Sequence, residues 1–219
     1  KGTVKARKSM KSFNSEIGVP LTVLGLENKW SSVFGWASNI TQGFFMVIFP
    51  SLYPQLLVLE VGADHPGDIK RITTWLSPDI TVVTRIPDLP VHVEYFSSPE
   101  EVKKEKSELV KALKSTGTFI SNADDAAVMG LASLTRAHMV SYGFGETAMV
   151  RGSNPEVDYH ERDDRMVPIG MKFNLDYHGE VHEVKLKGIL GAHVASAALA
   201  AAAVGVARKI PLKAIVEAL

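Results

Sequence analysis

The sequence predicts an α/β fold: a mostly parallel sheet with flanking helices, plus a small antiparallel hairpin region. The first observation is that short apolar runs alternate with helical patterns between residues 56 and 143, which is typical of parallel strands joined by helices. The second is that residues 171–188 alternate between apolar and polar side chains, as antiparallel strands with one exposed face do. Together these patterns predict a sheet with helices on both faces, followed by a hairpin.

The composition is that of an ordinary globular protein, with 46% hydrophobic and 22% charged residues among 219. Lys and Arg together number 24, as do Asp and Glu, so bulk charge does not favour nucleic acid or an acidic membrane as a partner. The absence of cysteine excludes disulfides, thiolate metal sites and a cysteine nucleophile, and it fits a reducing, cytoplasmic location. The chain begins at Lys1 with no signal peptide, so we expect a piece of a longer protein.

The first part of the chain contains a long segment without charge, between Lys29 and Glu60. Its densest apolar run, residues 44–49, is far shorter than the roughly 20 residues that a membrane-spanning helix needs. Two interpretations are open for this segment. It is either a hairpin that contacts a membrane surface or a partner through residues 33–53, or a helix packed into the core.

The alternating part begins with a continuous apolar run, which is typical of a strand covered on both faces. The expected elements are a strand at 56–61, a helix with Pro66 near its start, a strand at 79–84, a helix at 99–114, a strand at 117–121, a helix at 124–134 and a strand at 138–143. The sequence Ser98-Pro99-Glu100-Glu101 is a strong helix start, with a capping serine, a proline in the first turn and a glutamate three residues after the serine.

The pattern changes after Gly145. His178 and Gly179 sit at a turn position between the two alternating runs of the expected hairpin. An alanine-rich helix follows at 191–209, and another helix begins at 211. Alanine at this density favours helices packed closely against a neighbour.

Polar residues are expected along one edge of the predicted sheet. Glu60 lies near the end of the first clear strand, Thr84 and Arg85 end the second, His92 follows in the loop, and Asn122 ends the third. Ligands of an open parallel sheet bind beyond the carboxyl ends of its strands, so this edge is the candidate site. A carboxylate within an apolar run is costly unless paired, so we expect Glu60 to meet a cation, in a structural salt bridge or otherwise.

Lys106 interrupts the apolar stripe of the 99–114 helix. The apolar residues of that stripe repeat at helical spacing: Val102, Leu109, Val110 and Leu113. The lysine falls in the gap on the same face, so we expect it to point inward. Its stem could pack while the ammonium group reaches water, or the amine could serve phosphate or metal chemistry at the candidate edge.

No phosphate-binding loop of the form G-x-x-x-x-G-K-S/T occurs in the sequence, and no G-x-G-x-x-G follows a strand. Five other segments do appear in a recognisable order: "FNSEIGVPLTVLGL", "LVLEVGADHPGDI", "VHVEYFSSPEEVKKEKSEL", "SNADD" and "GAHVASAALAAAAVG". This series resembles the central ATP-binding domain of the Mur ligases, which is P-loop NTPase-like. The resemblance covers nearly the whole chain, apart from residues 30–55, which we expect to be an apolar insertion.

The resemblance implies a domain organisation. Residues 1–219 would be the central domain of such a ligase, truncated at its N-terminus so that the phosphate loop is absent. The N-terminal domain that binds the UDP-sugar and the C-terminal domain that closes on ATP would also be missing. We therefore expect this fragment alone to be inactive.

The resemblance also implies roles for metal-binding and catalytic residues. Glu60 matches the glutamate that binds the magnesium ion bridging the ATP phosphates, and His92 matches a histidine ligand of a second magnesium ion. Lys106 matches the lysine that is carbamylated in these enzymes, a change that turns a cation into an anion able to help hold magnesium.

Three further residues match positions associated with ATP. Asn122 and His193 match positions near the nucleotide, and Asn14 matches the asparagine-rich turn that follows the phosphate loop. His65, in "GADHPGDI", lies in a matching motif without an assigned role.

The implied reaction is ATP-dependent amide bond formation through an acyl phosphate. Among Mur ligases, the motifs are most similar to those of the enzyme that adds D-alanyl-D-alanine to UDP-N-acetylmuramoyl-tripeptide during peptidoglycan precursor synthesis. The implied partners are therefore a UDP-muramoyl-peptide and a D-amino-acid dipeptide. Two alternatives stay open: another ligase of this fold, such as a folylpolyglutamate or cyanophycin synthetase, or a degenerate, non-catalytic binding domain.

Overall fold

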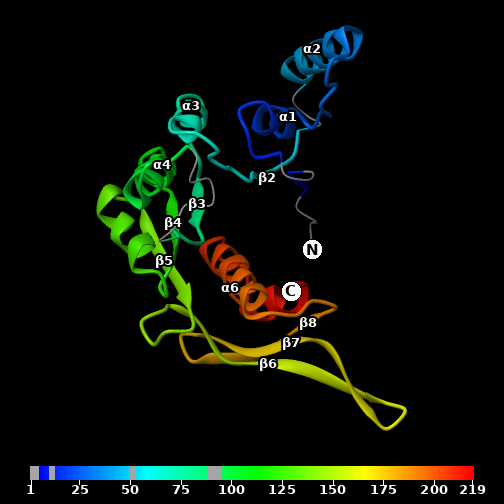
Figure 1. Ribbon diagram of the computed structural model, residues 1–219, viewed down its shortest axis with the longest axis vertical. Helices are drawn as coiled ribbons and strands as arrows, with labels where there is room; N and C mark the ends of the chain where they lie inside the picture. The colour runs from blue at the N-terminus through cyan, green and yellow to red at the C-terminus, as the bar shows by residue number, and fades with distance from the viewer. Residues whose placement is uncertain (1–4, 10–12, 50–52, 88–94) are drawn as a thin grey trace.

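The computed structural model describes residues 5–9, 13–49, 53–87 and 95–219, and it contains two sheets. The main sheet has six strands in the order β3-β4-β5-β6-β7-β8 (Figure 1). Their bounds are Ile80–Val83, Thr118–Asn122, His138–Gly143, Val150–Arg162, Arg165–Tyr177 and Glu180–Lys187. Strands β3 to β6 pair in parallel, and β7 and β8 add two antiparallel pairings. The predicted α/β fold with a parallel sheet and an antiparallel region is confirmed.

Helices cover both faces of this sheet, as the sequence predicted. The helices in chain order are α1 Gly18–Leu24, α2 Val33–Ile48, α3 Asp68–Thr73, α4 Pro99–Lys111, α5 Ala126–Met129, the 3₁₀ helix η2 Gly130–Leu134, α6 Ala192–Ala207 and α7 Leu212–Ala218. Phe119 of β4 packs with residues of α4, α5 and η2, whereas its neighbour Ile120 packs with α6 and α7. Successive residues of a strand face opposite sides of the sheet. Both side chains are fully buried because helices cover each of those sides.

The local signals for α4 and for the hairpin are confirmed in detail. The Ser98 hydroxyl accepts a hydrogen bond from the Glu101 backbone N–H at 3.3 Å, as expected of a helix cap. His178 and Gly179 have φ angles of 54° and 84° between β7 and β8. Positive φ at both central residues is what the tight two-residue hairpin turn requires.

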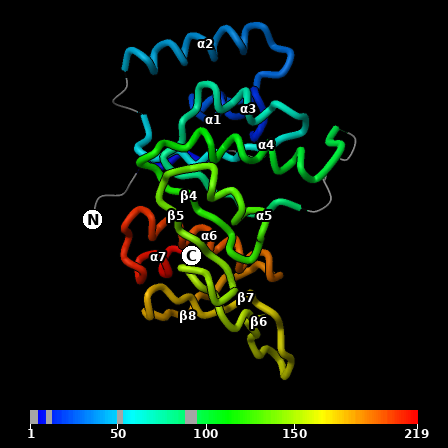
Figure 2. Tube along the Cα trace, turned by 90° about the vertical axis from the view of Figure 1, so that its left-hand side faces the viewer, coloured from blue at the N-terminus to red at the C-terminus, as the bar shows by residue number. Residues whose placement is uncertain are grey.

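The long strand β6 was not predicted. It pairs with β5 only through Val150 and Arg151, and then runs along β7 for most of its length. The ends of β6 and β7 extend beyond the rest of the sheet as a two-stranded ribbon (Figures 1 and 2). Its sequence, "SNPEVDYHER", is polar and contains proline, so it lacks the apolar alternation that signals a strand.

The first predicted strand is shorter and placed differently than expected. Strand β2 spans only Leu56–Val58 and pairs in parallel with β1, Ala6–Lys8, in a separate two-stranded sheet. The prediction of a strand covered on both faces is wrong, since the Val58 side chain is 55% exposed. A two-stranded sheet offers fewer neighbours than the interior of a six-stranded one, so this apolar run is only partly covered.

Residues 33–48 of the uncharged segment form one helix, α2, which is neither a hairpin nor a helix packed into the core. Its only buried residue is Asn39, whose side-chain amide donates to the Glu27 carbonyl at 2.9 Å. The large exposed apolar residues of α2 and the residue after it are Val33, Phe34, Ile40, Phe44, Phe45, Val47, Ile48 and Phe49. Figure 2 shows α2 at one end of the molecule and the β6–β7 ribbon at the other. None of the helices in the described ranges is long and apolar enough to cross a membrane.

Candidate active site

Of the edge that the sequence predicted, the structure brings together the parts at the carboxyl ends of β3 and β4, whereas the strand before Glu60 belongs to the separate two-stranded sheet. The Asn122 side-chain amide donates to the Thr84 carbonyl at 2.8 Å, and the Lys106 amine donates to the Arg85 carbonyl at 2.5 Å. The structure therefore brings together the end of β3, the end of β4 and one side chain of α4.

Two aspartates that follow β4 organise this edge, although sequence reasoning gave them no role. Asp125 accepts hydrogen bonds from the Ile86 N–H at 2.9 Å and, as the cap of α5, from the Val128 N–H at 3.0 Å. It therefore fixes the loop after β3. An aspartate directly before a helical pattern is a capping signal, so the sequence motif "SNADD" contained the information that could have found it.

Asp124 fixes the loop after β5 in the same way. Its carboxylate accepts from the Phe144 N–H at 2.7 Å and the Gly145 N–H at 2.8 Å. A Cβ atom at Gly143 would lie 2.7 Å from the same carboxylate, so glycine is needed for this close approach. The glycines of "YGFGET" thus accommodate a carboxylate of their own chain.

The Lys106 side chain is partly buried, as its position on the apolar stripe predicted. Burial lowers the pKa of its amine, because desolvation disfavours the charged form, and the negative charge of Asp125 opposes this shift. A lowered pKa increases the fraction of neutral amine, which is the nucleophilic form.

Glu60 and Asn14 are neighbours in loops that follow the strands of the two-stranded sheet, not at the edge of the main sheet. The Asn14 side-chain amide lies 3.5 Å from a Glu60 carboxylate oxygen, and the Gly62 N–H donates to the Asn14 carbonyl at 2.9 Å. The expectation that Glu60 is buried is wrong, and no Lys, Arg or His side chain in the described part of the chain forms a salt bridge with it. Because β2 ends at Val58, Glu60 lies in the exposed loop beyond it, where water solvates the carboxylate.

The remaining predicted site residues are not joined to this edge by any hydrogen bond or ion pair between described residues. The side chain of His193 is exposed in the first turn of α6, next to Gly191, and Glu60 makes no contact of either kind with Lys106. His92 lies outside the described residues. The ring of His65 lies 4.0 Å from that of Tyr95, on the turn before α3.

The described ranges contain no group of three or more His, Asp or Glu side chains placed to hold a metal ion. Magnesium, however, is usually held by one or two carboxylates together with substrate phosphates and water. The exposed Glu60 carboxylate, with the Asn14 amide beside it, fits that mode of binding.

Comparison with known proteins decides the family. The Mur ligase middle domain family matches residues 47–205 of this chain. The chain belongs to the Mur ligase family. The matched range of this Mur ligase chain includes Glu60, Lys106, Asn122 and His193, and it leaves Asn14 outside.

Curated relatives of this Mur ligase chain carry the name UDP-N-acetylmuramoyl-tripeptide–D-alanyl-D-alanine ligase. The protein from Mycobacterium tuberculosis strain H37Rv is 31% identical over 193 residues, which are 88% of this chain and 31% of the relative. The protein from Bacillus subtilis is 24% identical over 201 residues, which are 92% of this chain and 35% of the relative. The chain therefore spans about a third of the length of the curated relatives it matches.

Solved structures of Mur ligases share the fold of this chain. A crystal structure of MurF from Acinetobacter baumannii has a TM-score of 0.75 at 21% identity, over 99% of this chain and 40% of that one. A structure of MurF from Thermotoga maritima in complex with ADP has a TM-score of 0.69 at 18% identity, over 95% of this chain and 40% of that one.

Proposed function

We propose that the protein containing this chain is an ATP-dependent ligase that adds D-alanyl-D-alanine to UDP-N-acetylmuramoyl-tripeptide, in cytoplasmic synthesis of peptidoglycan precursors. The observation that carries this proposal is the 31% identity to the mycobacterial ligases across 88% of the chain. Because the chain spans about a third of those relatives, the complete activity needs the remaining parts of the protein.

Lys106 is proposed as the carbamylated lysine. Support comes from its partial burial, which lowers the pKa of the amine and so enlarges the neutral fraction that reacts with carbon dioxide. The carbamate would carry a negative charge close to Asp125 and thereby favour a divalent cation at this edge.

Glu60 and His92 are proposed as magnesium ligands, together with the Lys106 carbamate. When bound, magnesium screens the negative charges of the ATP phosphates and of the developing acyl phosphate. The exposed carboxylate of Glu60 supports this assignment, because a ligand to a nucleotide-bound ion must be reachable from solvent.

Asn14, Asn122 and His193 are proposed as residues near ATP. Asn122 is the last residue of β4, and ligands of an open parallel sheet usually bind just beyond that end. The binding of ADP by the MurF of Thermotoga maritima supports a nucleotide at this fold.

In the proposed reaction, the substrate carboxylate is phosphorylated by ATP, the amine of the dipeptide attacks the acyl phosphate, and phosphate leaves. The task of this chain is to hold polar groups in fixed positions around the phosphates. The loops after β3 and β5 are suited to that task, since Asp124 and Asp125 fix them through three hydrogen bonds from backbone N–H groups.

The test is phosphate release by the full-length protein with UDP-N-acetylmuramoyl-tripeptide and D-alanyl-D-alanine. We expect release to be stimulated only when both substrates are present. Stimulation by a folate or another peptide acceptor, with none by this pair, would assign the chain to another ligase of the fold. No stimulation by any acceptor would favour the non-catalytic alternative.

The carbamate has its own test. We expect Lys106→Ala to abolish phosphate release and short carboxylic acids to restore part of it, because they can supply the missing anion. Lys104→Ala is the matched control, since Lys104 is an exposed lysine of the same helix. Full activity of the Lys106→Ala protein would end the carbamate proposal.

The weak contact with a membrane surface or a partner, predicted through residues 33–53, also stays a proposal. It is supported by the exposed apolar side chains of α2. The test compares co-sedimentation with liposomes before and after deletion of residues 33–53. Equal partitioning of the two proteins counts against a membrane contact.

A further inference from the structure

Glu105 is a buried carboxylate that the proposed reaction does not use. It lies on α4 next to Lys106 and is only 7% exposed. No Lys, Arg or His side chain in the described part of the chain forms an ion pair with it. A buried carboxylate without a cation is unfavourable unless hydrogen bonds compensate for its lost hydration.

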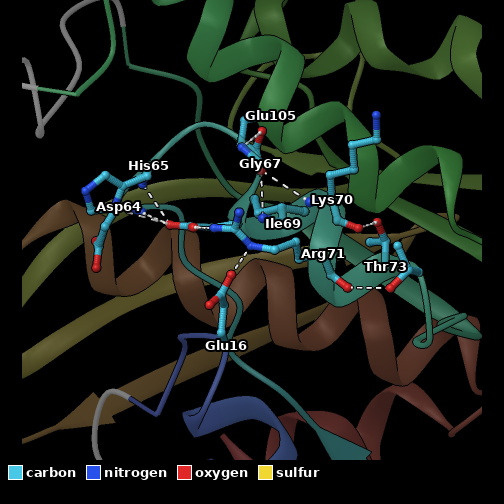
Figure 3. Close-up of polar contacts among 11 residues, drawn as sticks. Glu16, Asp64, His65, Gly67, Ile69, Lys70, Arg71, Thr73 and Glu105 are labelled. Carbon is cyan, nitrogen blue, oxygen red and sulfur yellow. Dashed lines mark hydrogen bonds and ion pairs between the residues drawn. The ribbon is translucent and has the colours of Figure 1, made fainter.

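The compensation comes from the backbone at the start of α3. The Glu105 carboxylate accepts hydrogen bonds from the N–H groups of Ile69 at 2.6 Å, Gly67 at 2.8 Å and Lys70 at 3.3 Å (Figure 3). The first N–H groups of a helix have no partner within the helix, so this side chain of α4 satisfies donors of α3. Figure 3 shows Glu105 reaching from α4 to this point.

The turn before α3 is held from its other side by Asp68. One oxygen of Asp68 accepts from the N–H groups of His65 at 2.7 Å and Asp64 at 3.0 Å, and the other accepts from Arg71 at 2.6 Å. Arg71 also forms an ion pair with Glu16 of the N-terminal segment (Figure 3). The turn is thereby linked to α4 through Glu105 and to the N-terminal segment through Arg71.

A short loop, residues 61–63, leads from Glu60 into this turn. The Gly62 N–H is bound to the Asn14 carbonyl, and the Asn14 amide lies beside the Glu60 carboxylate. Helix α4 therefore contacts two parts of the candidate site. Lys106 donates to the Arg85 carbonyl after β3, and Glu105 accepts from the Gly67 N–H in the turn before α3.

We propose that Glu105 is a positioning residue that fixes the turn before α3, and through the short loop from Glu60 also Glu60 itself, against the helix that carries Lys106. This inference rests on the proposed function in one respect, the role of Glu60 toward magnesium. The bond from Glu105 to α3 stands on the geometry alone.

The experiment compares Glu105→Ala and Glu105→Gln in the full-length protein. Glu108→Gln is the matched control, because Glu108 is a carboxylate of the same helix that pairs with Lys111 at the surface. We expect backbone amides 67–70 to exchange hydrogen about tenfold faster in Glu105→Ala, given the strength of hydrogen bonds to a charged group. Glu105→Gln keeps one accepting oxygen and should fall between the wild type and Glu105→Ala.

The second measurement is the magnesium dependence of ADP binding. Calorimetry measures it in the absence of any acceptor substrate. We expect the magnesium concentration for half-maximal binding to rise about tenfold in Glu105→Ala, less in Glu105→Gln, and not at all in the control. Affinity for ADP at saturating magnesium should stay close to that of the wild type, since Glu105 itself contacts no nucleotide in this proposal.

Two outcomes would overturn the inference. Unchanged exchange at residues 67–70 would show that the Glu105 bonds do not hold the turn. Faster exchange with an unchanged magnesium dependence would make Glu105 a helix cap without influence on Glu60. A wild-type protein that binds ADP with magnesium but forms no amide would instead count against the proposed reaction, and the magnesium measurement would still test Glu105.

Discussion

Lys106 places a charged amine in a partly buried position, where desolvation is unfavourable. Its amine is retained in a partly buried position at the cost of a lowered pKa, and it is held there by the Arg85 carbonyl. A neutral side chain of similar length would avoid the desolvation cost, so stability alone does not explain a lysine at this position. This observation motivates a prediction about pH.

We expect Lys106→Met to be about as stable as the wild type at pH 7, within roughly 1 kcal/mol, because removal of the buried charge offsets the lost hydrogen bond. The folded-state pKa of Lys106 lies below its ordinary value of 10.5. As pH rises from that lowered pKa to the ordinary one, the folded protein releases this proton before the unfolded chain does. The wild type should therefore gain stability relative to the variant across this window. Urea unfolding of both proteins from pH 7 to 10.5 is the measurement, and parallel pH profiles would contradict the expectation.

Tyr142 presents the opposite case, a neutral group that burial keeps neutral. Its side chain is fully buried, and its hydroxyl has no hydrogen-bond partner among the described residues. Burial, and to a lesser degree the charges of Asp124 and Asp125, raise its pKa to about 12. Titration of this hydroxyl therefore leaves the stability of the fold unchanged below about pH 10. The fold loses stability as pH rises from there through 12, because the unfolded chain releases the proton first.

We expect Tyr142→Phe to stabilise the chain by about 1 kcal/mol at pH 7, because an unsatisfied buried hydroxyl is removed without changing the ring. Between pH 10 and 12 the advantage of the variant should widen, since phenylalanine has no proton to lose. Denaturant unfolding at pH 7 and at pH 10.5 measures both effects. Destabilisation at pH 7 would mean that the hydroxyl has a partner in the folded protein.

The helices and strands that carry strong local signals are those that the sequence predicted well. Helix α4 begins at its capping serine, and the β7–β8 hairpin turns at His178 and Gly179. Strand β6 carries no such signal, because its outer half is a polar ribbon that is held by pairing with β7 rather than by burial. Partners distant in sequence, such as Glu105 with α3 or Asp125 with Ile86, cannot be inferred from local patterns.

The connection between α5 and β3 gives a prediction at this scale. Asp125 satisfies one N–H of α5 and one of the loop after β3, so Asp125→Ala leaves both without that acceptor. We expect a loss of about 1–3 kcal/mol in the free energy of unfolding. Asp125→Asn, which keeps one accepting oxygen, should lose less. Asp79→Ala is the control, because the Asp79 side chain is 80% exposed and pairs with Lys114 at the surface. Equal stability of the Asp125→Ala protein and this control would show that the two bonds contribute little.

At the scale of the whole molecule, the chain combines a six-stranded sheet with a small N-terminal sheet. Both core clusters consist of residues from β3 onward, and none comes from α2. The sequence predicted the helices on both faces of the main sheet, because alternating apolar runs and helical patterns require that arrangement. It could not predict that β2 pairs with β1, because an apolar run does not identify its partner strand. For the same reason, the order of the motifs did not show that Glu60 follows a strand of the small sheet instead of the main sheet.

This division predicts that α2 is dispensable for the stability of the main sheet. We expect replacement of residues 33–48 by a short Gly-Ser linker to change the unfolding free energy of the six-stranded sheet by no more than about 0.5 kcal/mol, since most of the removed residues are exposed and none belongs to either core cluster. Leu199→Ala is the opposite control, because Leu199 is fully buried against the sheet and its truncation should lose about 2–5 kcal/mol. Hydrogen exchange of the β4 amides reports on this sheet specifically. Faster exchange in the linker protein, approaching that of Leu199→Ala, would show that α2 supports the core and is not an insertion on its surface.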